Sequence, residues 1–143
     1  MRRTVTETDN LLFSALTMNP AALHLDAEYS KGTVFGERIV NSVFTLGLLV
    51  GLSVYDTTYG TTLGNLGWDE VRMPAPVFEG DTIYAQTTIL SKRESKSRPN
   101  MGLVEIESTG FKQDGTVVLK FRRSILVYKR GHEPKRPEPT IKS

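Results

Sequence analysis

Two polar residues early in the chain have side chains suited to moving a proton and holding a water molecule. His24 is one of only two histidines, and the other, His132, lies in a charged, proline-containing C-terminal stretch. Histidine exchanges protons near neutral pH, so it can act as a general acid or base. Asn19 comes five residues earlier, and its amide can hold a water or a carbonyl in place. An ordinary loop before a helix is the alternative interpretation.

The composition of the 143-residue chain excludes several classes of function. Charged residues make up 24% and hydrophobic residues 38%, which is typical of a soluble globular domain. A net charge of +2 is too small to indicate a nucleic-acid partner. The chain has no cysteine, so it can have no disulfide, thiolate zinc site or cysteine nucleophile. We also find no cluster of metal-ligating residues and predict no metal.

The apolar segments do not indicate a membrane protein. The longest apolar run, residues 43–54, contains small and polar residues and is too short to cross a bilayer. The first residues are basic but are not followed by an uninterrupted apolar stretch, so we expect no signal peptide. A chain without cysteine suits a reducing compartment. We therefore expect a cytoplasmic protein without a membrane partner.

The order of the predicted elements indicates an α+β domain. Capping residues precede a helix at 7–16, and a helical turn follows at 26–30. Asn41 and Ser42 are suitable N-cap residues for a long helix at 42–54 that is apolar nearly all round. Alternation of apolar residues predicts strands at 61–73, 82–90, 101–111 and 116–128, with a basic loop at 91–100. We expect one domain over residues 1–130, a long buried helix facing a curled antiparallel sheet, and a charged tail at 131–143.

Three segments, in order and spacing, resemble the MaoC-like dehydratases, also called R-specific enoyl-CoA hydratases. Residues 17–24 match the family loop Ser/Thr-Gly-Asp-x-Asn-Pro-x-His, with Thr17 first and His24 last. Residues 38–43 match the Arg-Ile-x-His-Gly-Met start of the central helix. Residues 71–81 match the strand and turn Phe-x-x-Pro-Val-x-x-Gly-Asp. The resemblance covers nearly all of residues 4–130 and implies the hot-dog fold, in which a curved antiparallel sheet wraps a long central helix.

The chain departs from the family pattern in both of the first two motifs, and in the first the family's Asn-Pro falls on Ala21-Ala22. The family's catalytic aspartate falls on Asn19, whose amide does not ionise. The proton transfer that the family assigns to this aspartate must therefore pass to His24 alone or to a carboxylate from elsewhere. The helix-start His-Gly becomes Asn41-Ser42. This version, together with residues 63–71, resembles the mesaconyl-CoA, β-methylmalyl-CoA and itaconyl-CoA hydratases within the family.

The resemblance assigns roles to the residues of the first two motifs. His24 would be the general base for hydration and the general acid for dehydration, and Asn19 would orient the water. Ser42 would offer a backbone N–H to the thioester oxygen at the N-terminus of the central helix, where negative charge is favoured. Asn41 would line the pocket. Helix capping is the alternative role for Asn41, and it is compatible with the role of Ser42.

Basic residues are candidates for binding the anionic parts of a CoA thioester. Arg38 would pair with a substrate carboxylate or a CoA phosphate, and the alternative is a structural salt bridge with Glu37 or another acid. The basic loop would hold the CoA phosphates, although a charge run is often only solvated surface. Its candidate residues are Lys92, Arg93, Lys96 and Arg98.

The resemblance implies a hydro-lyase acting on an enoyl-CoA or 3-hydroxyacyl-CoA thioester. The polar helix start suggests a short or branched acyl group that carries a carboxylate. CoA is part of the substrate, so no cofactor is implied, and hot-dog sheets usually pair into a homodimer or a larger homo-oligomer. A hot-dog thioesterase is one alternative, but residues 42–54 lack the carboxylate that it would need. A non-catalytic acyl-CoA binding protein is another, because asparagine replaces aspartate.

Overall fold

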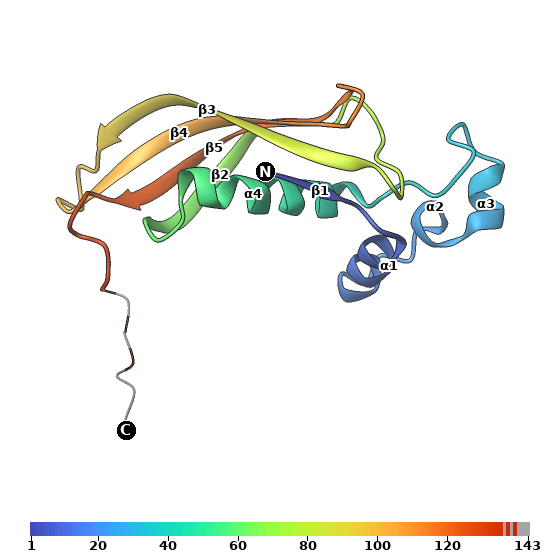
Figure 1. The fold of residues 1–143 in the computed structure, drawn as a ribbon, viewed down its shortest axis with the longest axis horizontal. Helices are drawn as coiled ribbons and strands as arrows, with labels where there is room; N and C mark the ends of the chain where they lie inside the picture. The colour runs from blue at the N-terminus through green and yellow to red at the C-terminus, as the bar shows by residue number, and fades with distance from the viewer. Residues whose placement is uncertain (136, 138, 140–143) are drawn as a thin grey trace.

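A five-stranded antiparallel sheet curves over one long helix in the computed structural model, which describes residues 1–135, 137 and 139 (Figure 1). The predicted tail therefore lies partly outside the described residues. The sheet order is β1-β3-β4-β5-β2, which leaves β1 and β2 at the edges. The helices are α1 (Glu7–Leu16), α2 (Ala22–Leu25), α3 (Ala27–Lys31) and α4 (Ser42–Thr57). The strands are β1 (Arg2–Thr4), β2 (Thr62–Arg72), β3 (Thr82–Glu94), β4 (Met101–Phe111) and β5 (Val117–Tyr128).

Local sequence signals place several elements, and strand pairing extends others. Helix α1 and strand β4 have the predicted bounds. Helix α4 continues past residue 54 to Thr57, and β3 continues past residue 90 to Glu94 because it stays paired with β4 through Arg93 and Leu103. The first part of the predicted basic loop is therefore strand. Strand β1, only three residues long, was not predicted because it is too short to show a period of two.

Helix α4 packs on the inner face of the sheet through a close approach to β4. Leu49 is fully buried there, and a Cβ atom added to Gly110 would lie 3.1 Å from its Cδ1 atom. Only glycine fits at that position without a shift of the leucine. The core consists of apolar side chains from α4, β3, β5 and the segments before α1, α4 and β3: Val5, Val40, Leu49, Leu52, Val77, Ile83, Val118, Leu119 and Phe121.

The sheet covers only one side of α4 in a single chain. Val43 is 56% exposed and Tyr55 63% exposed, and the two glycines between them, Gly47 and Gly51, are also exposed. The all-round apolar sequence of α4 predicted a helix wrapped on every side. That wrapping is present on the sheet side, Phe13 of α1 adds an edge contact with Phe44, and much of the other side is open to solvent.

The segment before β3 lies against the start of α4. The Val40 N–H donates to the Val77 carbonyl at 2.8 Å, and Ile39 forms an antiparallel bridge with Phe78. The chain then turns at Gly80, whose φ of +91° favours glycine. The Asp81 carboxylate closes the predicted turn by accepting the Phe78 N–H at 2.8 Å. These contacts fix residues 73–78 beside the α4 N-terminus.

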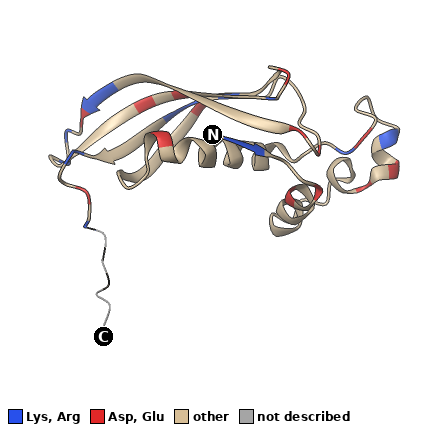
Figure 2. Cartoon of the chain, in the orientation of Figure 1, with Lys and Arg blue, Asp and Glu red and all other residues tan. Residues whose placement is uncertain are grey.

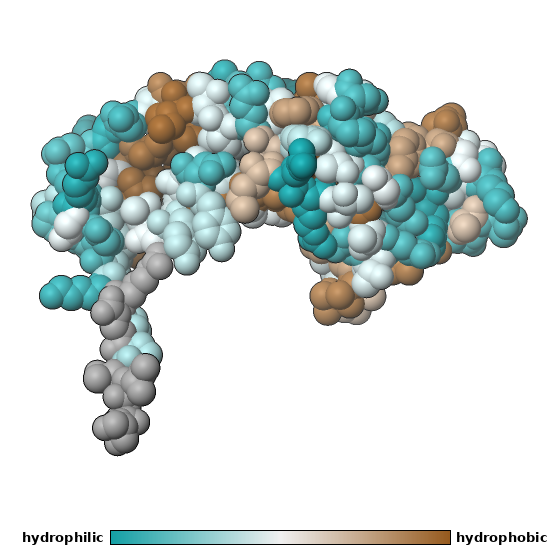
Figure 3. All heavy atoms as spheres, in the orientation of Figure 1, coloured by the Kyte–Doolittle hydropathy of each residue, from teal (hydrophilic) through white to brown (hydrophobic). Residues whose placement is uncertain are grey.

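Figures 2 and 3 show where charged and apolar residues gather. Figure 2 shows a basic stretch at the C-terminal end of β3, at the opposite end of the sheet from α2. Figure 3 shows apolar side chains at the end of α1 that points away from the sheet, and Leu12 and Leu16 of this helix are exposed. Among the described residues, no helix has the length and apolar character needed to span a membrane.

Candidate active site

His24 lies on the short helix α2 and is tied to the segment before α4. Its Nδ1 atom is 2.9 Å from the Ile39 carbonyl oxygen. A carbonyl oxygen only accepts hydrogen bonds, so Nδ1 must carry the hydrogen, and Nε2 of the neutral ring keeps its lone pair. The Ile39 N–H donates in return to the Leu23 carbonyl at 3.2 Å. Nε2 itself has no hydrogen-bond partner among the described residues.

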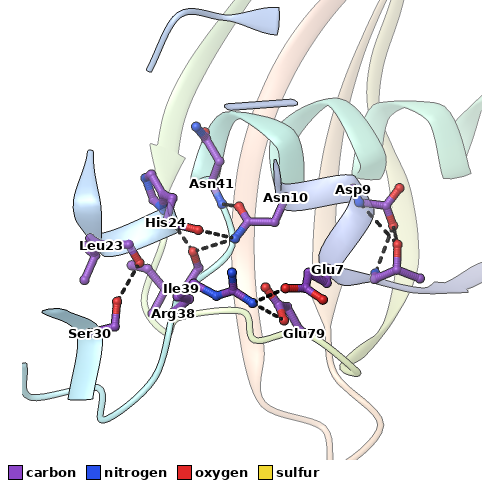
Figure 4. A network of polar contacts seen from close by, with 11 residues as sticks. Glu7, Asp9, Asn10, Leu23, His24, Ser30, Arg38, Ile39, Asn41 and Glu79 are labelled. Atoms are coloured by element: carbon purple, nitrogen blue, oxygen red, sulfur yellow. Dashed lines mark hydrogen bonds and ion pairs between the residues drawn. The ribbon is translucent and has the colours of Figure 1, made fainter. Parts of the chain in front are cut away.

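A buried asparagine that the sequence analysis did not single out joins His24 to the helix start. Asn10 on α1 is fully buried, and its Nδ2 donates to the carbonyls of His24 at 3.1 Å and Ile39 at 3.2 Å. Its Oδ1 accepts the Asn41 N–H at 2.9 Å. Asparagine is disfavoured in a helix interior, so its place among apolar residues was a usable signal, but its partners are not visible in the sequence. Figure 4 shows the whole network.

Asn41 and Ser42 occupy the N-terminus of α4 in different ways. Asn41 is buried, and its Oδ1 caps the helix by accepting the Val43 N–H at 3.0 Å. The capping alternative therefore describes its side chain. Ser42 is exposed, and its backbone N–H has no acceptor among the described residues. That N–H is a donor at the positive end of the helix dipole, as the sequence analysis expected of an oxyanion site.

A cavity of about 310 Å³ opens beside this helix start. Residues 73–77 form one wall, and the first turn of α4 forms another. None of its lining side chains is charged, and the Thr45 hydroxyl is already directed to the Asn41 carbonyl at 3.4 Å. An acyl group would therefore meet mainly apolar atoms. The lining residues are Phe35, Ile39, Val40, Ser42, Thr45, Met73, Pro74, Ala75, Pro76, Val77 and Val118.

Arg38 is engaged by carboxylates of the chain itself. Its guanidinium forms a hydrogen-bonded ion pair with Glu7 of α1 and lies 3.3 Å from Glu79. The hydrogen bond to Glu7, together with the nearby Glu79, raises the pKa of Arg38 despite its desolvation. The structural alternative therefore accounts for its contacts, with Glu7 and Glu79 as partners in place of Glu37.

Asn19 makes no hydrogen bond to the His24 side chain among the contacts of the described residues. Its Oδ1 accepts the Ala21 N–H at 3.1 Å, which forms a local turn before α2. The side-chain amide nitrogen has no hydrogen-bond partner among the described residues. The ungapped family match thus places Asn19 near α2 in the chain, without a direct hydrogen bond to the histidine ring.

The four basic residues predicted to hold CoA phosphates do not form one cluster. Arg93, Lys96 and Arg98 line a groove of about 630 Å³ with leucine and serine residues and no acid. Lys92 lines a separate cavity of about 610 Å³, because successive strand residues point to opposite faces. Strand β3 has 13 residues and so spans about 40 Å. Figure 1 shows its basic end at the far end of the sheet from α2, so these residues cannot meet His24 of the same chain.

Comparisons with known proteins agree with this architecture. The MaoC like domain family matches residues 1–110. Mesaconyl-CoA hydratase of Cereibacter sphaeroides is 30% identical over 97% of this chain, which spans 40% of that protein's length. The (R)-specific enoyl-CoA hydratase of Rhodospirillum rubrum is 27% identical over 92% of this chain and 85% of its own.

Solved structures show the same fold. The monoamine oxidase regulatory protein from Archaeoglobus fulgius superposes with a TM-score of 0.82 at 32% identity, covering 90% of this chain and 86% of that one. Rv0216 of Mycobacterium tuberculosis, described as a double hot-dog fold, superposes with a TM-score of 0.80 at 19% identity; the match covers 94% of this chain and 42% of that one. One hot-dog unit therefore corresponds to this chain. From the family match over residues 1–110 and this shared fold, the chain belongs to the MaoC-like dehydratase family.

Proposed function

We propose that this domain is a hydro-lyase that adds water to an enoyl-CoA thioester or removes it from a 3-hydroxyacyl-CoA. One observation carries the proposal: the His24 ring is held through Nδ1 by the carbonyl of Ile39, three residues before α4 begins, which leaves Nε2 as the base. The family match and the hydratases among its relatives support the same reaction.

In the hydration direction, His24 Nε2 takes a proton from water while the water oxygen forms a bond to the β-carbon. The π electrons of the double bond move toward the thioester, and negative charge develops on its oxygen. The Ser42 N–H and the dipole of α4 stabilise that charge. The imidazolium then returns its proton to the α-carbon, so the sum is the addition of one water. Asn19 orients the water through its amide nitrogen.

The acyl group fits the apolar cavity of about 310 Å³, a volume at the small end of ligand pockets. We propose a short or branched acyl group. A carboxylate-bearing group, as in the substrate named for the Cereibacter sphaeroides relative, would need a counter-charge that the cavity lining does not supply. The reaction needs no metal or redox cofactor, because the thioester itself activates the double bond.

We further propose a homodimer or larger homo-oligomer in which each subunit completes the other's site. The open side of α4 and the edge strand β2, with the exposed Leu66 and Trp68, provide apolar surface for a second copy. The groove lined by Arg93, Lys96 and Arg98 would then bind the CoA phosphates of a thioester held at the other subunit's histidine. CoA chemistry and the lack of cysteine favour the cytoplasm.

Incubation with crotonyl-CoA, mesaconyl-CoA and itaconyl-CoA tests the reaction. Turnover is measured as loss of the absorbance of the conjugated thioester and as product mass. His24→Ala should lower kcat by about 10²- to 10⁴-fold. His132→Ala, at the only other histidine, is the matched control and should leave kcat unchanged. Turnover that persists in His24→Ala would overturn the assignment. Binding of all three esters without turnover would favour an acyl-CoA binding protein.

A thiol reagent in the same assay detects released CoA and so tests the thioesterase alternative. Helix α4 does include one carboxylate, Asp56, but it lies in the last turn and is exposed. It is 14 residues from Ser42, or about 20 Å along the helix. We therefore expect the wild-type protein to release CoA no faster than the His24→Ala variant does.

The CoA contact has its own test. Replacing Arg93, Lys96 and Arg98 together by Ala should raise KM for crotonyl-CoA but not for crotonyl N-acetylcysteamine, which has no phosphates. Lys120→Ala, a basic residue on β5 outside the groove, is the control. An unchanged KM for crotonyl-CoA in the triple variant would reject the groove as the phosphate site.

A further inference from the structure

The Asn10 side chain forms hydrogen bonds with three backbone groups, which belong to the two halves of the proposed site. One half is the helix that carries the base, reached through the His24 carbonyl. The other half is the start of α4, reached through the Ile39 carbonyl and the Asn41 N–H. The side chain is fully buried, so water does not compete for these bonds.

The chemistry of the three contacts requires an amide. Two N–H donors face two carbonyl oxygens, and one oxygen faces an N–H. An ionised carboxylate of the same shape supplies no donor, and an aliphatic side chain supplies neither donor nor acceptor. Asparagine therefore matches all three backbone groups at once, and removing it would leave buried polar groups without partners.

The Ile39 carbonyl is the point where Asn10 acts on the histidine ring. This oxygen accepts both the Asn10 amide at 3.2 Å and His24 Nδ1 at 2.9 Å. The Asn10 bond holds the peptide group of Ile39 in the orientation that receives the ring N–H. Figure 4 shows the two bonds converging on this oxygen.

We propose that Asn10 is a positioning residue that acts through His24: it fixes the tautomer of the ring and its placement against the α4 N-terminus. The catalytic consequence rests on the proposed hydratase function, whereas the tautomer is a property of the folded chain. In the wild-type protein, neutral His24 carries its hydrogen on Nδ1. Misplacement of a catalytic group by about 1 Å can reduce a rate by about 10²-fold.

Two substitutions separate the role of Asn10 toward His24 from its role toward α4. Asn10→Leu removes all three bonds, whereas Asn10→Asp keeps the acceptor for the Asn41 N–H and loses the donors to His24 and Ile39. Ser14→Ala is the matched control, because Ser14 is equally buried on α1 and its hydroxyl has no hydrogen-bond partner among the described residues.

Two readouts are measured on each folded variant. Steady-state kinetics with the active thioester should show kcat lowered about 10- to 100-fold in both Asn10 variants, with KM nearly constant. Nitrogen NMR of the His24 ring should show the Nδ1–H tautomer in the wild type and in Ser14→Ala, and a shift toward the Nε2–H tautomer in the Asn10 variants. A purely structural role would lower stability without moving the ring signals.

The proposal is overturned if the Asn10 variants keep the wild-type ring signals, whatever happens to kcat. It is also overturned if the wild-type ring is mainly the Nε2–H tautomer, or if kcat is unchanged in an active enzyme. If no thioester is turned over, the proposed function fails, and the NMR result still decides the inference. If neither Asn10 variant folds, the wild-type ring decides: a mainly Nδ1–H tautomer with slowly exchanging Asn10 amide protons supports the proposal, and a mainly Nε2–H tautomer or fast exchange of either amide proton rejects it.

Discussion

Lys112 Nζ lies 2.6 Å from Asp81 Oδ2 in an ion pair whose side chains are only 10% and 12% exposed. The same carboxylate accepts the Phe78 N–H at 2.8 Å and the Gln113 amide at 3.2 Å. The pair thus joins the turn before β3 to the turn between β4 and β5. Because residues 73–77 line the apolar cavity, this ion pair holds one wall of the proposed site in place.

Lys112→Met should lower the free energy of unfolding by about 3–5 kcal/mol, because it leaves the Asp81 carboxylate buried without its counter-charge. Adding Asp81→Asn to that variant should recover part of the loss, since no uncompensated charge then remains. Urea unfolding of the single and double variants at pH 7 measures both effects. If the loss in the double variant equals the sum of the losses in Lys112→Met and Asp81→Asn, the pair is not coupled.

Asp9 should make the stability of α1 depend on pH. Burial raises the pKa of Asp9, but hydrogen bonds from Thr6 and contact with Arg3 outweigh it and hold the pKa below the usual value of 3.8. A carboxyl whose pKa is lower in the folded state stabilises above that usual value and loses this effect as the pH falls through the folded pKa. Asp9→Asn should therefore cost about 1 kcal/mol at pH 7 and almost nothing near pH 2.

Urea unfolding at a series of pH values between 7 and about 2 measures this difference. Glu37→Gln is the control, because Glu37 is exposed and has no ion pair among the described residues. A constant gap between wild type and Asp9→Asn at all pH values would exclude a contribution from the Asp9 charge.

Arg38→Met tests whether the arginine serves the fold or the substrate. Its contacts with Glu7 and Glu79 predict a loss of about 2 kcal/mol in the free energy of unfolding, with KM for the thioester nearly unchanged. Glu7→Gln should produce a smaller loss, because the Glu7 side chain is 56% exposed and Glu79 still pairs with Arg38, and the double variant should lose less than the sum. A large increase in KM without loss of stability would instead assign Arg38 to the substrate.

Arg123 should be dispensable for stability, unlike its partner. Its guanidinium donates to Ser53 Oγ of α4 at 2.9 Å. No carboxylate among the described residues pairs with it, and burial lowers the pKa of Arg123. Arg123→Met should be neutral or stabilising, because methionine fills the space without a buried charge. Ser53→Ala should destabilise by about 1–3 kcal/mol, since it removes a buried hydrogen-bond acceptor. Thermal and urea unfolding distinguish the two outcomes.

Short-range signals were enough for several elements. The capping side chain of Thr6 and the following apolar residues define α1 within its bounds, and the alternation of residues 101–111 defines β4. The resemblance of three motifs placed His24 and Ser42 beside the start of the long helix. The bounds of α1 and β4 depend on residues close together in the chain, so capping and periodicity predict them, whereas the roles of His24 and Ser42 came from the family resemblance.

Contacts between distant residues were not accessible from the pattern. The sequence pattern predicts Lys92 and Arg93 in one basic loop with Lys96 and Arg98, but pairing with β4 extends β3 and sends the side chains of Lys92 and Arg93 to opposite faces of the sheet. Arg38 had several possible partners in the sequence, and packing of α1 and of the turn before β3 selected Glu7 and Glu79.

The sequence alone therefore predicted the long helix, four of the five strands and the family resemblance, and it proposed His24 for proton transfer, because these depend on residue type, short motifs and local period. Only the tertiary structure decided which nitrogen of His24 is free, which side chain positions it, and that the basic groove lies at the far end of the sheet. The reason is physical: hydrogen bonds among Asn10, His24 and Ile39 join residues up to 29 positions apart, and such bonds exist only after the helices and the sheet have packed together.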